Sequence, residues 1–142
     1  MRLAAQMQGS RTMHLEFPAL GKHAGDVRRH LKEHLATWGW LDMVDDTLLA
    51  ANEVFVNAVE HGSSGASDTV SVEINCATDT LRIAITDSSH SLPDPRVASG
   101  FAVGGRGLAL VAAVSDRWGA ELTHDGSGGK QVWFTLSRSS TP

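Results

Sequence analysis

The segment 48–62, LLAANEVFVNAVEHG, constrains the fold of this chain more than any other stretch. Successive residues of an α-helix are turned by about 100°, so residues three or four apart share a face. On this spacing one side carries mostly apolar residues: Leu48, Asn52, Phe55 and Val59, with Val56 at the edge. The other side carries polar residues: Glu53, Asn57, Glu60 and His61. The segment therefore predicts an amphipathic helix that begins at Asp42 or Asp45 and ends at Gly62.

Three of the polar residues form a single stripe along this helix. Glu53, Asn57 and His61 are spaced four residues apart, which stacks their side chains on the helix surface. Carboxylate and amide oxygens are ligands that Mg²⁺ prefers, and this cation keeps part of its water when it binds beside phosphates. The stripe therefore predicts a site for a hydrated cation and a phosphate-bearing ligand. The alternative is an ordinary solvated helix face.

The rest of the chain follows strand and helix patterns. Apolar and polar residues alternate in five segments, which predicts strands at 12–17, 69–76, 81–86, 118–123 and 130–137. Apolar residues at helical spacing predict two further helices, at 22–38 and 108–116. Gly39 is expected to end the first of them. This order is typical of an α+β fold in which helices cover one face of a sheet.

Composition narrows the class of protein. The 142 residues are expected to form one domain, 1–142, with flexible tails at 1–11 and 138–142. A net charge of -4 gives no bulk electrostatic reason to bind nucleic acid or an anionic membrane. No apolar run is long enough to span a membrane and no signal-peptide pattern opens the chain, so we expect a soluble cytoplasmic protein. Cys76 is the single cysteine, which excludes an intrachain disulfide.

Two further places predict ligand chemistry. The turn Gly105-Arg106-Gly107-Leu108 opens a predicted helix, where glycines let a ligand approach the backbone and free N–H groups attract phosphate. Asp87 ends a predicted strand, and its carboxylate can accept a hydrogen bond from an exocyclic amine such as that of adenine. Each has an ordinary alternative, a plain turn for the glycines and a turn or capping residue for Asp87.

Taken in order, these pieces resemble the GHKL family of ATP-binding domains. The matching residues are Glu53-x-x-x-Asn57-Ala58-x-x-His61-Gly62, Asp87, Gly105-x-Gly107-Leu108 and Gly129-Lys130-x-Val132-Trp133. Within that family the chain is similar to the bacterial anti-sigma factor serine/threonine kinases, over about residues 12–136. The resemblance implies an α+β two-layer sandwich, the Bergerat fold, in which helices cover one face of a mixed, mostly antiparallel sheet.

The resemblance also implies a role for each matching residue and ATP with Mg²⁺ as cofactors. Glu53 would be the general base for the attacking hydroxyl, and Asn57 would coordinate the Mg²⁺ that bridges the ATP phosphates. Asp87 would bind the adenine amine, and the segment 88–104 would be a lid over the nucleotide. The phosphates would lie against the turn formed by Gly105, Arg106, Gly107 and Leu108.

The implied function is phosphorylation of an anti-anti-sigma partner of the STAS type and sequestration of a sigma factor. Family members commonly form homodimers. The basic residues Arg28, Arg29 and Lys32 of the first predicted helix are the candidate partner surface, and the alternative for them is a solvated helix face.

The chain departs from the family pattern at two places beside the adenine position. Serines follow Asp87 where the family usually has glycines, and Gln131 replaces a hydroxyl-bearing residue, which we expect to change contacts near Asp87. A catalytically weak or inactive partner-binding module is therefore the alternative function. A further alternative, the ATPase domain of a sensor histidine kinase, is expected to follow a helix pair that this sequence does not show.

Overall fold

The computed structural model describes residues 10–61, 68–88, 105–123 and 129–138. The elements in chain order are β1 (Ser10–Pro18), η1 (Gly21–His23), α2 (Ala24–Thr37), η2 (Leu41–Met43), α3 (Val44–His61), β2 (Thr69–Ala77), β3 (Thr80–Asp87), α4 (Gly105–Val114), β4 (Arg117–Leu122) and β5 (Lys130–Ser137). Every predicted strand and helix is therefore present. β1 begins at Ser10 and so takes in the last residues of the expected N-terminal tail, and the rest of that tail lies outside the described residues.

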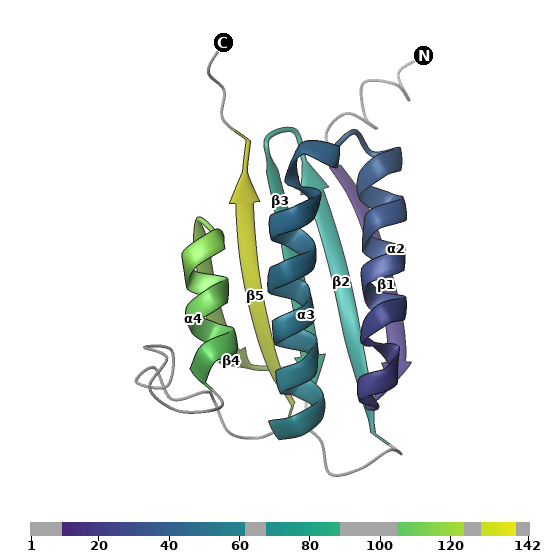
Figure 1. Ribbon diagram of the computed structural model, residues 1–142, viewed down its shortest axis with the longest axis vertical. Helices are drawn as coiled ribbons and strands as arrows, with labels where there is room; N and C mark the ends of the chain where they lie inside the picture. Colours follow the sequence, from purple (N-terminus) through teal and green to yellow (C-terminus); the bar gives the residue numbers. More distant parts are fainter. Residues whose placement is uncertain (1–9, 62–67, 89–104, 124–128, 139–142) are drawn as a thin grey trace.

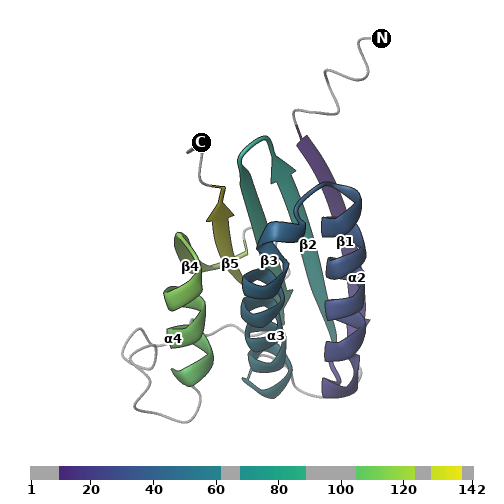
Figure 2. The same cartoon turned by 45° about the horizontal axis from the view of Figure 1, so that its top comes forward.

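The five strands form one sheet in the order β1-β2-β3-β5-β4. All three α-helices lie on the same face of this sheet, with α3 between α2 and α4 (Figures 1 and 2). This confirms the α+β two-layer sandwich. Each of the four strand pairings is antiparallel, so the described sheet is antiparallel throughout rather than mixed. The reason is that β5 pairs with both β3 and β4 and runs opposite to each of them.

Alternation along the strands explains why one sheet face is buried. In β2, β3 and β5 every second side chain points toward the helices, and these residues form the inner layer of the core: Val70, Val72, Ile74, Cys76, Leu81, Ile83, Ile85, Val132, Phe134 and Leu136. The inward rows of β3 and β5 end differently, on the charged residues Asp87 and Lys130, which are also buried. The apolar layer therefore gives way to a polar pair at one end of these two interior strands.

The predicted end of the first helix is confirmed in detail. Gly39 has φ +82°, the left-handed conformation that glycine adopts without steric cost. The Gly39 N–H donates to the Ala36 carbonyl at 3.3 Å and the Trp40 N–H donates to the Leu35 carbonyl at 2.7 Å. These two bonds form a Schellman cap, and the Trp40 and Leu35 side chains are both buried in the core. The chain is thereby turned from α2 into η2 and α3.

The buried face of α3 differs from the face that the sequence predicted. Its buried residues are Val44, Thr47, Ala50, Ala51, Val54, Phe55 and Ala58. Of the predicted apolar side only Phe55 is buried, whereas Leu48, Asn52 and Val59 are partly exposed. Three of these buried residues are alanines, and short side chains allow close approach where α3 packs between two other helices. The stripe with Glu53 and Asn57 is therefore half-buried rather than opposite the core.

The structure also bears on the single cysteine and on the question of a membrane-spanning helix. Cys76 is buried, and desolvation raises the pKa of its thiol, which agrees with a structural rather than a reactive cysteine. Among the described residues, no helix is long and apolar enough to cross a membrane.

A glycine in β4 permits a close contact with a tryptophan on β5. A Cβ atom at Gly119 would lie 2.8 Å from Cζ2 of Trp133, its partner in the strand register. Trp133 also makes a cation–π contact with Arg82 on β3, whose Cζ lies 5.1 Å from the ring centroid. The indole therefore has little freedom to retreat from a new methyl group.

We expect Gly119→Ala to lower the free energy of unfolding by about 1 to 3 kcal/mol because it overpacks this contact. Chemical denaturation measures this value. The matched control is Gly25→Ala in α2, where the nearest atom to the new Cβ is 3.6 Å away, Nη2 of Arg28. That change should be neutral or stabilising, since alanine favours helix. Equal effects of the two substitutions would contradict the overpacking explanation.

Candidate functional site

Four elements begin or end at one edge of the molecule, the lower edge in Figure 1. There α3 ends at His61 and β3 ends at Asp87, while α4 begins at Gly105 and β5 begins at Lys130. The predicted site residues come from parts of the chain that are far apart in sequence, and the fold brings their elements to this edge. At this edge the ends of β3 and β5 lie in the sheet layer, and the end of α3 and the beginning of α4 lie in the helix layer.

A buried ion pair, Asp87 with Lys130, lies in the sheet layer at this edge of the molecule. Asp87 and Lys130 are register partners on β3 and β5. The Lys130 Nζ lies 3.2 Å from the Asp87 carboxylate Oδ2, and the two side chains are only 9% and 1% exposed. Both point toward the helix layer because they continue the inward rows of their strands. Asp87, which was predicted to bind an exocyclic amine, is therefore held by an ammonium group at the same depth.

Lys130 is the residue whose importance the sequence analysis missed. The sequence pattern places it in a family motif without a role of its own, and it predicts that Gln131 changes the contacts near Asp87. The Gln131 side chain does not lie beside that of Asp87, because Gln131 points to the opposite sheet face. There its amide nitrogen donates to Thr86 Oγ1 at 3.3 Å. Strand alternation was the available signal: in a pairing that faces Asp87 with Lys130, the two side chains share the buried face.

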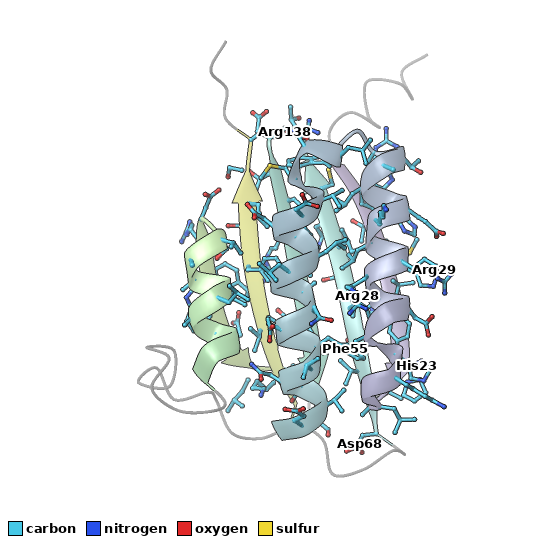
Figure 3. The ribbon with its side chains drawn as sticks, in the orientation of Figure 1. His23, Arg28, Arg29, Phe55, Asp68 and Arg138 are labelled. Carbon is cyan, nitrogen blue, oxygen red and sulfur yellow. The ribbon has the colours of Figure 1, made fainter. Side chains whose placement is uncertain are left out.

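Glu53 and Asn57 lie on the flank of α3 that faces away from α2. A hydrogen bond from the Arg28 guanidinium to Asn52 Oδ1 marks the α2-facing flank, and Arg28 points from α2 toward α3 in Figure 3. At about 100° per residue, Glu53 and Asn57 are turned by about 100° and 140° from Asn52. Both are half-buried, and α4 is the next helix on that side. Their carboxylate and amide therefore face the side on which α4 begins.

The first turn of α4 contains the predicted phosphate-binding residues. α4 begins at Gly105 and includes Arg106, Gly107 and Leu108, so the predicted turn is already helical. The first N–H groups of a helix lack partners within it, and the helix dipole favours anions there. The Leu108 side chain is buried in the core, so only the backbone of this residue is placed to meet a ligand. Side chains of residues 105–107 lie outside the described part, as do the His61 side chain and all of the predicted lid 88–104 except Ser88.

The residues present suit a magnesium ion that is shared with phosphates. No group of three or more His, Cys, Asp or Glu that could hold a metal occurs among the described residues. Mg²⁺ does not need such a group, because it commonly binds one or two protein oxygens together with phosphates and water. The amide oxygen that would serve as the protein ligand is that of Asn57, which is half-buried on α3. This donor set fits a nucleotide-bound cation better than a cage made of protein ligands.

The basic residues of the candidate partner surface are partly engaged within the chain. Arg28 bonds to Asn52, and Arg29 Nη2 lies 3.1 Å from the Asp26 carboxylate. Hydrogen bonds from His23 and Arg29 lower the pKa of Asp26 below its usual value. Lys32 is exposed on the same helix. The predicted surface is thus present on α2, although Arg28 is turned toward α3.

Comparisons with known structures agree with this fold. A crystal structure of the RsbU and RsbW domains of a Mycobacterium tuberculosis protein is similar with a TM-score of 0.62 and 24% identity, covering 89% of this chain and 32% of that one. A chain of the SiaB–SiaC complex from Pseudomonas aeruginosa is similar with a TM-score of 0.58 and 16% identity, covering 97% and 96%. This chain therefore spans about a third of the first structure's length and nearly all of the second. No curated protein matches the sequence.

These two likenesses concern the fold. The family follows from the sequence, because the family model described as the histidine kinase-like ATPase domain matches residues 17–136, which include α3, Asp87, α4 and Lys130. The chain therefore belongs to the histidine kinase-like ATPase domain family.

Proposed function

We propose that this chain is a bacterial regulatory kinase of the anti-sigma factor type. It binds ATP with Mg²⁺ and transfers the terminal phosphoryl group to a serine or threonine of an anti-anti-sigma partner of the STAS type. The observation that carries the proposal is the position of Glu53 and Asn57. They lie on the flank of α3 that faces away from α2, in a fold that brings the end of α3, Asp87 and the N-terminus of α4 to one edge.

Each group at this edge has a task in phosphoryl transfer, which depends mostly on positioning and charge stabilisation. Asp87 binds the adenine amine, and the N–H groups of the first turn of α4, from Gly105 to Leu108, bind the phosphates. Arg106 adds positive charge beside them. Asn57 would hold Mg²⁺, which would supply positive charge to the phosphate oxygens when bound. Glu53 orients the attacking hydroxyl and accepts its proton.

The proposed partners are proteins. One similar structure contains an RsbW domain and the other is a complex of SiaB with SiaC, which supports regulation through a bound protein. We propose that the same chain also sequesters a sigma factor. In this proposal it is a single domain, acts in the cytoplasm and forms a homodimer, as members of this class commonly do. The exposed residues Arg29 and Lys32 of α2 are the proposed partner contacts.

The second candidate is a partner-binding module with little or no catalysis. The observation that favours it is the Lys130 ammonium on Asp87, which occupies part of the carboxylate that would bind adenine. Under this alternative Glu53→Ala leaves regulation intact. Under the kinase function the same change prevents the partner from being phosphorylated, so regulation fails to reset.

The first experiment is calorimetric titration of the purified protein with ATP and Mg²⁺. We expect Asn57→Ala to weaken Mg²⁺-dependent ATP binding at least about tenfold, because it removes a protein oxygen from the cation. The control is Asn52→Ala, which removes the same amide from the other flank of α3, where it contacts Arg28. Similar losses in both variants, or no binding by the wild type, would contradict the proposed site.

A further inference from the structure

The pair Asp87 and Lys130 interrupts an otherwise apolar layer. The remaining inward positions of β3 and β5 carry leucine, isoleucine, valine and phenylalanine. Removing two charges from water is costly, and apolar residues of similar volume often stabilise a buried position as well as an ion pair does. Stability therefore does not account for an ammonium and a carboxylate at this place. Its position, where β3 ends and β5 begins at the candidate site, suggests a role in binding.

The pair offers complementary groups at one depth. A carboxylate accepts hydrogen bonds at about four lone-pair positions, and an ammonium donates three. The contact of 3.2 Å between Nζ and Oδ2 engages one donor of Lys130, and an ammonium group has three donors in all. Because the residues are register partners on adjacent strands, the acceptor and the donor lie side by side.

A purine edge presents matching groups side by side. In adenine the 6-amino group donates and the neighbouring ring nitrogen N1 accepts. In guanine the order is reversed, with an acceptor at position 6 and a donor at N1. When Asp87 accepts from the group at position 6, an ammonium beside it can bond to N1 of adenine but meets an N–H of guanine.

We propose that Lys130 determines base specificity by donating a hydrogen bond to N1 of adenine while Asp87 accepts one from the 6-amino group. This inference rests on the proposed function, since it assumes that the nucleotide base binds at Asp87. It assigns Lys130 to the ligand rather than to the core. It also explains why the charged pair is compatible with nucleotide binding: the ammonium takes part in recognising the base and does not merely occupy the carboxylate.

The test compares ATP with 1-deaza-ATP, in which a C–H group replaces N1, by calorimetry on the full chain with Mg²⁺. We expect the wild type to bind 1-deaza-ATP roughly 10- to 100-fold more weakly than ATP, because a hydrogen bond to a charged donor is lost. In Lys130→Met we expect weaker ATP binding and a ratio between the two ligands within about threefold. Lys130→Arg keeps the charge and the donors and should keep most of the ratio.

The outcomes separate this inference from the proposed function. A wild type that binds neither ligand overturns the proposed function and this inference with it. A wild type that binds ATP, with the same ratio in Lys130→Met as in the wild type, overturns the inference alone. Tighter ATP binding by Lys130→Met also overturns it, because the ion pair would then compete with the base. If Lys130→Met does not fold, the wild-type and Lys130→Arg ratios decide, and equal binding of both ligands by these proteins contradicts the inference.

Discussion

Asp87→Ala is expected to lower the free energy of unfolding by about 3 to 5 kcal/mol, because it leaves the Lys130 ammonium buried without its counter-charge. Lys130 is 9% exposed and lies 3.2 Å from the carboxylate that would be removed. It is buried on the inward face of β5, so removing Asp87 leaves its charge largely shielded from water. Urea or guanidinium denaturation of the wild type and the variant measures the difference.

The double variant Asp87→Ala with Lys130→Met is the control. It removes both charges, so no uncompensated ion remains, and it should be more stable than Asp87→Ala alone. This ordering separates the electrostatic cost from the loss of volume, because the double variant carries the same alanine. If it is as unstable as the single variant or less stable, the loss comes from packing and not from the buried charge.

Sequence patterns were sufficient to predict the elements but not their arrangement in the sheet. Alternation of apolar and polar residues predicted β2, β3 and β5, and the cap at Gly39 followed from the known preference for glycine at helix ends. The order of the strands depends on which distant segments pair, and β5 lies between β3 and β4. No local pattern encodes that choice, because register is set by contacts between distant segments and by the shared core.

The face of α3 shows a limit of periodicity arguments. Large apolar residues such as Leu48 and Val59 dominated the predicted side, whereas the packed side uses Ala50, Ala51 and Ala58. Alanine contributes little to an apolar pattern but suits a helix with neighbours on both flanks. Thr47 is also buried, since its hydroxyl donates to the Met43 carbonyl at 2.7 Å and so satisfies its polar atom inside the helix.

Local sequence patterns indicated some residues of the candidate site but not Lys130. Asp87 and the first turn of α4 were identifiable because each follows a recognisable boundary, a strand end or a glycine-rich turn. Lys130 was not, because its side-chain partner lies across the sheet and a lysine in a strand is ordinarily exposed. Its burial depends on the register between β3 and β5, which only the folded chain defines.

Glu53→Gln is expected to reduce phosphoryl transfer to the partner by about 10²- to 10⁴-fold, with the ATP dissociation constant changed by less than about threefold. The amide keeps the size of the carboxylate but cannot accept the proton of the attacking hydroxyl, and general-base catalysis contributes an effect of this size. Glu53 is half-buried on the same flank of α3 as Asn57, one helical turn earlier. Single-turnover transfer from labelled ATP measures the rate, and calorimetry measures binding.

Glu60→Gln is the matched control, because Glu60 is an exposed carboxylate on the same helix and its loss should leave transfer nearly unchanged. A large effect confined to Glu53 with ATP binding preserved would assign the loss to the chemical step, since binding and transition-state stabilisation are then separated. A Glu53→Gln variant as active as the wild type would contradict the role of general base. A wild type that binds ATP and partner without transfer would favour the partner-binding module, in which the nucleotide site serves regulation rather than catalysis.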